Sequence, residues 1–487
     1  MSAPDLILAA LGIPLAATPL IWLARGDPDR REAVTLLAAA GLFAVVALLV
    51  PIVMNGGRPG AVLFKVLPGL ALAFEVEPLG LLFALIASTL WIATSVYSIG
   101  YMRGNKEQHQ TRYYMFFALA LAATMGIALA ANLFTLFIFY EALTIATYPL
   151  VTHKGTDEAR AGGRTYLTIL LTTSILFFLL AILLTWQATG TLDFRPGGIL
   201  AGQASPTLIA ILLVLYTFGI GKAALMPFHR WLPAAMIAPT PVSALLHAVA
   251  VVKAGVFAVL KVVIYIFGID TLAAIPASRW MAYAAAVTII AASLIALTRD
   301  NLKARLAYST VSQLAYIVLG AMLANRLGAV GGAMHIATHA FGKITLFFCA
   351  GAIYVATHKT EVSQLDGLGR RMPITMAAFF LGSLSIIGLP PMGGLWSKWY
   401  IALGTLDAGS LTLLAVLMVS SLLNIFYLMP IPVRAFFRKP AEVAPAEGIR
   451  EAPWPCLVAL VFSSLGAFAL FVYPAPLFRL ASALFAN

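Results

Sequence analysis

The sequence predicts an all-α polytopic membrane protein, and three observations support this fold class: composition, the length of the apolar runs, and the charge of the loops between them. Of the 487 residues, 61% are hydrophobic and only 10% are charged, whereas soluble proteins are nearer a quarter charged. The apolar runs are continuous, so they lack the polar–apolar alternation of a membrane β-barrel. This composition excludes a soluble enzyme, a disordered chain and a nucleic-acid binder.

A helix needs about 20 residues to cross the hydrocarbon core of a bilayer. About fourteen apolar runs meet this length, near residues 5–24, 33–54, 79–101, 113–131, 133–151, 164–189, 206–236, 241–268, 279–298, 304–324, 328–357, 373–403, 411–437 and 454–478. No basic residue precedes the first run, which predicts a permanent helix and no cleavable signal peptide. Residues 60–78 are too broken to span, and the alternation at 74–77 predicts a short strand, half of a surface hairpin.

The loops between these runs alternate in charge. Of the 31 Lys and Arg residues, twenty fall in odd-numbered loops, six in even-numbered loops or the tails, and five inside the runs. Cytoplasmic loops collect Lys and Arg. We therefore expect a multi-pass protein of the cell inner (cytoplasmic) membrane with both termini facing outward. The same rule accounts for the net charge of +12.

Two runs, 206–236 and 373–403, are long enough that a straight helix would reach about 46 Å, well past a core of about 30 Å. Both contain helix-breaking residues near the middle, at Gly219, Gly221 and Pro227 and at Gly388, Pro390, Pro391, Gly393 and Gly394. Both predict discontinuous helices, with Lys222 preceding its break and Lys398 following its break. Paired interruptions of this kind indicate an inverted-repeat transporter.

This pattern predicts four parts of the chain. Residues 1–112 would hold the first three helices and a short outward-facing hairpin, and 438–487 a cytoplasmic loop and the last helix. Between them, 113–268 and 279–437 would form two five-helix repeats that enter the membrane from opposite sides, each with one discontinuous helix.

Five ionisable residues lie deep inside the predicted helices: Glu141, Lys222, Lys253, Lys343 and Lys398. Each costs roughly 2.5–3.5 kcal/mol at the bilayer centre, so five cost about 12–17 kcal/mol, comparable to the stability of a whole domain. Structural ion pairing is the alternative, but a single acid would serve four lysines. We therefore favour a functional proton or ion path. Lys261 lies near a helix end and is expected to snorkel to the surface.

The histidines extend this pattern. His335, His339 and Lys343 are spaced i, i+4, i+8 and so share one helix face, as a proton relay would require; packing or a metal pair are the alternatives. His247 and Lys253 are six residues apart and face different directions, so they share a path only if it turns. The sequence contains no phosphate loop, HExxH or CxxC motif, so we expect no cofactor and no metal.

The residues around these charges resemble a known family. Residues 221–236, which begin Gly221-Lys222 and include Pro227-Phe228-His229, and residues 239–247, which end in His247, are similar to the signature of antiporter-like membrane subunits. The stretches 335–343 and 388–398 also match. Such subunits occur in Mrp-type multisubunit Na⁺/H⁺ antiporters, in respiratory complex I and in membrane-bound hydrogenases. The resemblance covers residues from about 80 to 437.

The resemblance implies a role for each position. Glu141 resembles the fifth-helix glutamate and Lys222 the seventh-helix lysine with which it pairs, whereas Lys253 resembles the bridging lysine of the eighth helix. His335, His339 and Lys343 resemble the central series, and Lys398 the lysine near the exit. In the family these residues line a hydrated axis along the membrane midplane.

The resemblance implies a secondary-transporter subunit, closest in pattern to the D-type member of the Mrp antiporters, with Val251-Val252-Lys253-Ala254-Gly255 as the distinguishing run. We expect it to move protons within a hetero-oligomeric membrane complex that exchanges a monovalent cation, with Na⁺ the expected one. The alternative is a proton-pumping subunit of a complex I-type NADH-quinone oxidoreductase or a membrane-bound hydrogenase. A purely structural scaffold and a membrane-embedded enzyme are further alternatives.

Overall fold

The computed structural model describes residues 2–439 and 448–485, apart from the side chains of Leu246 and His247. Helices dominate this part of the chain, which confirms the predicted fold class. Ten of the described helices are long and apolar enough to cross a membrane: α1 (Ala3–Leu23), α2 (Pro28–Met54), α3 (Pro78–Gly104), α4 (Gln110–Ala128), α5 (Leu133–Val151), α6–α7 (Asp157–Thr189), α13 (Pro276–Thr298), α15 (Arg326–Thr357), α18–α19 (Leu411–Phe437) and α20 (Trp454–Val472).

The four other predicted runs are also helical. One is the 21-residue helix α14 (Leu302–Met322), and the other three are interrupted. They consist of α8 (Pro206–Gly219) with α9 (Trp231–Ala234), α10 (Thr240–Ala244) with α11 (Val251–Val262), and α16 (Pro373–Ile387) with α17 (Gly394–Asp407). The short helix α12 (Ile269–Ala273) lies between two runs, and the short helix α21 (Ala475–Ser482) begins within the last run and extends beyond it.

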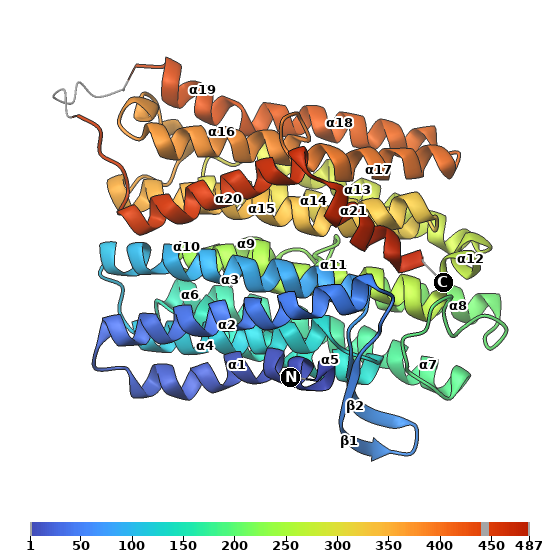
Figure 1. The fold of residues 1–487 in the computed structure, drawn as a ribbon. Coiled ribbons are helices and arrows are strands. Elements are labelled where there is room, and N and C mark those ends of the chain that lie inside the picture. Colours follow the sequence, from blue (N-terminus) through green and yellow to red (C-terminus); the bar gives the residue numbers. More distant parts are fainter. Residues whose placement is uncertain (1, 440–447, 486–487) are drawn as a thin grey trace.

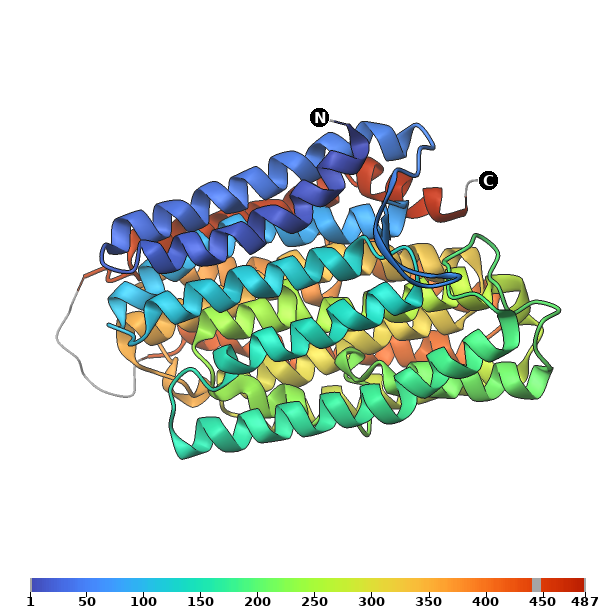
Figure 2. The ribbon, with the colours of Figure 1, turned by 90° about the horizontal axis from the view of Figure 1, so that it is seen from below.

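The helices run side by side, and helix α15 joins the early and late halves of the chain. Helices up to α11, drawn blue to green, form the lower part of Figure 1, and the later ones, yellow to red, form the upper part. Helix α15 contacts α3, α10 and α11 of the first half and α14, α16, α17 and α20 of the second. Both termini lie at the same end of the bundle (Figures 1 and 2); that this end faces outward stays a prediction.

The predicted hairpin is present. Strands β1 (Gly60–Leu67) and β2 (Leu70–Glu75) pair antiparallel, with Gly60 opposite Glu75. The end of β2 is fixed to the turn between α4 and α5, where the Glu75 amide donates to the Leu129 carbonyl at 2.8 Å. Asn132 begins α5 by accepting from the Thr135 amide at 2.8 Å, because an Asn side chain satisfies an otherwise unpaired amide at a helix start.

Both long helices are interrupted at the glycine and proline residues, as the sequence predicts. Helix α8 ends at Gly219, and the unwound backbone is stabilised by Trp231, whose indole N–H donates to the Gly221 carbonyl at 3.0 Å. Such partners are required because lipid offers none. Helix α16 ends at Ile387, and Gly388 adopts φ +90°, a conformation that glycine reaches without strain.

One detail of the prediction is wrong. The sequence pattern places Lys222 before its break, but the residue lies inside the unwound segment, in the 3₁₀ turn Gly221–Ala223. The unwinding begins at Ile220. The glycines on either side allow a close approach to the neighbouring helix, since a Cβ on Gly219 would lie 2.4 Å from the Phe178 nitrogen and one on Gly221 would lie 2.2 Å from the Thr173 hydroxyl. The inverted-repeat relation of 113–268 to 279–437 stays a prediction.

The expectation that Lys261 snorkels is also wrong. Lys261 is fully buried, and its ammonium lies 3.2 Å from the Glu77 carboxylate and donates to the Ala130 carbonyl at 2.8 Å. Glu77 begins α3, where it accepts from the amides of Leu79 and Gly80 at 2.7 Å each. This ion pair ties α3, α11 and the α4–α5 turn together at the end of the bundle that carries the hairpin.

Removing one partner of this ion pair should destabilise the protein. Lys261→Met leaves the Glu77 carboxylate buried without its counter-charge, which costs about 3–5 kcal/mol. We expect a clear drop in the thermal unfolding temperature of the purified protein. The double variant Glu77→Gln with Lys261→Met should recover most of the loss, and a Lys261→Met variant as stable as the parent would contradict the assignment.

Candidate functional site

Lys222 is held by the middle of helix α5. Its ammonium donates to the Tyr140 carbonyl at 2.8 Å and to the Thr144 hydroxyl at 2.5 Å, and it lies 3.2 Å from the centre of the Tyr140 ring. The Lys222 amide donates to the Tyr140 hydroxyl at 3.0 Å. Lys222 is fully buried. These neutral partners can hold either the ammonium or the amine.

Glu141 does not contact Lys222 directly. Among the described residues, neither carboxylate oxygen of Glu141 has a hydrogen-bond partner, although both are buried. Tyr140 and Thr144 share a helix face because they are four residues apart, whereas Glu141 is rotated by about 100° from Tyr140. The Glu141 charge is still close enough to act on Lys222. The expected pairing is therefore electrostatic and not a bonded ion pair.

Helix α11 packs directly on the unwound segment through Gly255. A Cβ atom on Gly255 would lie 2.3 Å from the Ala223 nitrogen and the Lys222 carbonyl carbon. Lys253, two residues earlier, is fully buried, and its side-chain nitrogen lies 2.5 Å from Nδ1 of His339 on α15. This contact joins the two halves of the molecule.

The Lys253–His339 contact constrains the protons that the pair can hold. At 2.5 Å one nitrogen must donate and the other must accept, so two cations cannot occupy this geometry. Either a lysine N–H, from an ammonium or an amine, donates to an unprotonated imidazole nitrogen, or an imidazole N–H donates to a neutral amine. The two nitrogens therefore share one hydrogen between the two halves of the molecule, a geometry in which a proton can be transferred.

The chain of polar groups continues along α15 towards α17. The imidazole rings of His339 and His335 stack with centroids 5.7 Å apart. Nδ1 of His335 lies 2.8 Å from the Ser397 hydroxyl, which also contacts the Thr338 hydroxyl at 2.8 Å. Ser397 precedes Lys398 in the chain, so the buried imidazoles lead to the second discontinuous helix.

Lys398, on α17, connects the two parts of that discontinuous helix. Its ammonium donates to the Ile387 carbonyl at 3.1 Å, at the C-terminus of α16, where a cation is favoured by the helix dipole. It lies 4.7 Å from the centre of the Tyr316 ring, and the same ring stacks on His335 at 5.8 Å. Tyr316 thus contacts both ends of the step from His335 to Lys398.

Lys343 lies on the opposite side of His339 along α15. Its ammonium donates to the Ser309 hydroxyl at 2.6 Å and to the Leu306 carbonyl at 3.3 Å. Ser309 also accepts from the Tyr427 hydroxyl at 2.9 Å. Lys343 therefore forms a branch towards α14 and α18.

The structure brings together most of the predicted residues, but not all. Lys253, His339, His335 and Lys398 form one continuous line, and Lys222 adjoins it through Gly255; the side chain of His247 lies outside the described part of the structure. Sequence reasoning did not identify four residues that contact the buried lysines, their ligands or His335: Tyr140, Thr144, Tyr316 and Tyr427. For Tyr140 and Thr144, the only sequence signal was their i, i+4 spacing on either side of Glu141.

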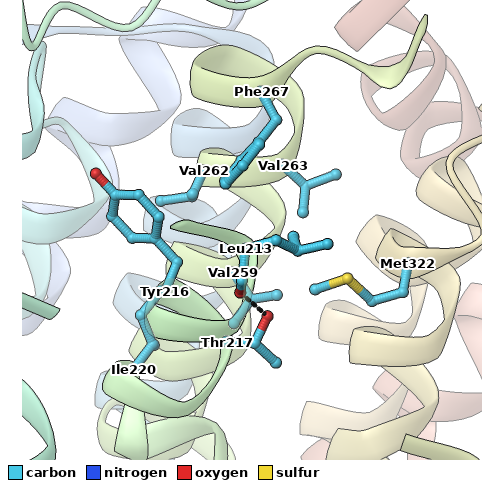
Figure 3. Close-up of a pocket in the computed structure, with 9 residues that line it drawn as sticks. All are labelled: Leu213, Tyr216, Thr217, Ile220, Val259, Val262, Val263, Phe267 and Met322. Carbon is cyan, nitrogen blue, oxygen red and sulfur yellow. Dashed lines mark hydrogen bonds between the residues drawn. The ribbon is translucent and has the colours of Figure 1, made fainter. Parts of the chain in front are cut away.

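An apolar gap lies beside the first discontinuous helix, between α8, α11 and Met322 (Figure 3). It is too narrow to hold a water molecule and is lined by Leu213, Tyr216, Thr217, Ile220, Val259, Val262, Val263, Phe267 and Met322. The one hydroxyl drawn in contact, that of Thr217, donates to the Leu213 carbonyl at 2.6 Å. Water therefore has no polar route to Lys222 through this gap.

The close approach at Gly255 generates a test. Gly255→Ala places a methyl group against backbone that cannot yield, which should destabilise the protein by about 1–3 kcal/mol and separate Lys253 from the Lys222 segment. We expect a lower unfolding temperature and reduced proton flux. Gly12→Ala is the control, since its Cβ would meet nothing within 4 Å; equal behaviour of the two variants would refute this packing.

Comparisons with known proteins identify the family to which the chain belongs. The family model described as "NADH:quinone oxidoreductase/Mrp antiporter, TM" matches residues 130–424. The chain is 34% identical to NADH-quinone oxidoreductase subunit N of Desulforudis audaxviator, over 76% of this chain and 74% of that protein. It is 32% identical to NAD(P)H-quinone oxidoreductase chain 5 of Synechocystis, over 68% of this chain but only 49% of that one. The matched region thus spans about half the length of the chain 5 relative.

Two solved structures share the fold over nearly the whole chain. The Mrp complex from Dietzia sp. DQ12-45-1b contains a chain with a TM-score of 0.87 and 23% identity, covering 100% of this chain and 98% of its own. The membrane-bound sulfane sulfur reductase, an archaeal respiratory membrane complex, contains one with a TM-score of 0.86 and 24% identity, covering 99% and 97%. With the match over residues 130–424, these findings show that the chain belongs to the antiporter-like subunit family of Mrp and complex I-type membrane complexes.

Proposed function

We propose that this protein is the proton-translocating subunit of a multisubunit monovalent cation/proton antiporter, with Na⁺ the expected cation. The observation that supports this most strongly is the line Lys253–His339–His335–Ser397, which ends beside Lys398 and crosses between the two halves of the molecule. It would operate in the cell inner membrane, with both termini outward, beside other membrane subunits.

The proposed path is Lys222, Lys253, His339, His335 and Lys398, with Lys343 as a branch and His247 as a further member. Burial disfavours a charge on each group, and close like charges disfavour one another. Only a few of these groups are therefore protonated at the same time. Adding one at the Lys222 end makes release at Lys398 more favourable, which is a means of moving charge without moving helices.

Glu141 is proposed to control the first step. Its buried carboxylate has no hydrogen-bond partner among the described residues, so only its charge acts on Lys222. Protonating Glu141, or providing it with a cation from a neighbouring subunit, would weaken the hold on a proton at Lys222. The carboxylate thus couples the path to events outside this chain.

The second candidate is a proton-pumping subunit of a complex I-type NADH-quinone oxidoreductase or a membrane-bound hydrogenase. The names of the curated relatives favour it, since they are quinone oxidoreductase subunits N and 5. The subunit composition of the purified complex distinguishes the two: quinone-binding or iron–sulfur subunits indicate the pump, and a set of small membrane subunits alone indicates the antiporter.

Removing the charge at the start of the path tests the proposal. Lys222→Ala and Glu141→Ala should each abolish Na⁺-dependent proton flux into membrane vesicles, measured with a pH-sensitive dye, while the complex still assembles. Lys65→Ala, on the exposed strand β1, removes the same charge outside the path and should leave flux unchanged. Normal flux with Lys222→Ala would favour a purely structural role.

A further inference from the structure

A cavity of about 480 Å³ opens at the end of the bundle opposite the termini. It lies between the loop that joins α3 to α4, the loop that joins α5 to α6, and the C-terminal end of α15. Its rim carries the exposed side chains Lys106, His109, Lys154 and His358. At about 30 Å³ for each molecule of liquid water, the cavity has room for many waters.

Two titratable groups line the inner wall of the cavity. Glu107 is half-buried, and burial raises the pKa of its carboxyl, while the positive charges of Lys154 and Lys303 oppose that rise. His153 is 3% exposed, and its ring lies against the Gln108 backbone. Burial and the neighbouring Arg112 guanidinium lower the pKa of His153 to about 4, so its ring stays neutral at neutral pH.

The backbone around the cavity is also unusual. Lys106, His109 and His358 all adopt left-handed conformations, with φ between 52° and 55°. Such conformations cost non-glycine residues roughly 1–2 kcal/mol each and cluster at functional sites. Three such residues around one cavity indicate that the backbone keeps the shape of the cavity despite a local cost in conformational free energy.

Polar side chains lead from this cavity towards Lys253. Tyr101 lies near the end of α3, six residues before Glu107, and the Thr240 hydroxyl donates to the Tyr101 hydroxyl at 3.4 Å. Ser243 is fully buried, and its hydroxyl has no partner among the described residues. Thr240 and Ser243 are three residues apart on α10, so they share a face, and this short helix leads into α11.

We infer that this cavity is a proton-uptake site, with Glu107 as the first acceptor and the hydroxyls of Tyr101, Thr240 and Ser243 as the route to Lys253. The inference rests on the proposed function. A hydronium ion in the cavity loses an O–H bond as one forms on a Glu107 oxygen, leaving water. The protonated carboxyl then gives that proton to the first hydroxyl and becomes a carboxylate again, while each hydroxyl passes its own proton to the next. The last proton forms an N–H bond on the neutral amine of Lys253, which becomes an ammonium.

Nine other charged or titratable groups surround Glu107. They are Lys106 and His109 on its own loop, His153 and Lys154 on the α5–α6 loop, Tyr354 and His358 on α15, Lys303 at the start of α14, Arg112 on α4 and Tyr101 on α3. The side-chain nitrogen of Lys303 donates to the Ala238 carbonyl at 2.6 Å, which fixes the position of its amino group. The neutral His153 ring can relay a proton, accepting at one nitrogen while donating from the other.

Glu107→Gln in the complete complex, reconstituted into vesicles, tests the inference. Proton flux should fall by about tenfold or more, and its dependence on the pH at the cavity side should flatten, while Glu107→Asp should retain part of the flux. Glu158→Gln, an exposed acid on the same end, is the control and should behave as the parent. If Glu107→Gln matches that control, the inference is overturned; if the parent moves no protons, the proposed function fails instead.

The Lys154→Gln variant provides a second test, in which the pH dependence of proton flux is measured. A loss of stability alone would not shift that pH dependence. The Lys154 charge stabilises the Glu107 carboxylate, so its removal should raise the pKa of Glu107. The midpoint of the flux–pH curve should therefore move to higher pH, without loss of the maximal rate. Arg160→Gln, an exposed cation outside the cavity, should leave the midpoint in place. A midpoint that does not move with Lys154→Gln contradicts the role of Glu107.

Discussion

The contact between Lys253 and His339 is the interaction on which the proposed proton path depends. It is the point at which the helices of the first half meet those of the second through titratable atoms, 2.5 Å apart. Its geometry places one hydrogen between the two nitrogens, so we propose that a proton passes between the two halves here. The other polar contacts lead to this pair or away from it: Lys222 through the packing at Gly255, and His335 through the stacked rings.

Much of the fold follows from local sequence signals. The cost of breaking backbone hydrogen bonds in lipid makes apolar run length a reliable guide to helices, and glycine and proline mark the two breaks. The buried lysines are identifiable because a charge at lipid depth is costly. The hairpin is visible in the alternation of residues 74–77.

Contacts between distant parts of the chain are not predictable in this way. Lys261 resembles a side chain that reaches the surface, because its partner Glu77 lies far away in sequence at the start of another helix. The Tyr140 and Thr144 ligands of Lys222 are ordinary helix residues whose role emerges only when α5 and the unwound segment are adjacent. The sequence predicts a pairing of Glu141 with Lys222, but the position of Glu141 on the helix turns it away. Each of these depends on the rotation of one helix against another, which periodicity alone leaves open.

The surroundings of the path differ at its two sides. The gap beside the first discontinuous helix is apolar and too narrow for water, whereas the end opposite the termini holds a wide polar cavity with hydroxyls leading inward. A proton path open to water on both sides at once would leak, so the proposed function assigns proton uptake to the side that carries the polar cavity.

The most direct measurement of proton transfer between the two halves is proton flux in the complete complex with His339→Phe. Phenylalanine keeps a ring of similar size beside His335 but has no nitrogen to share a proton with Lys253. We expect the complex to assemble and proton flux to be lost. Flux at the level of the parent would show that protons do not cross between the two halves at this contact.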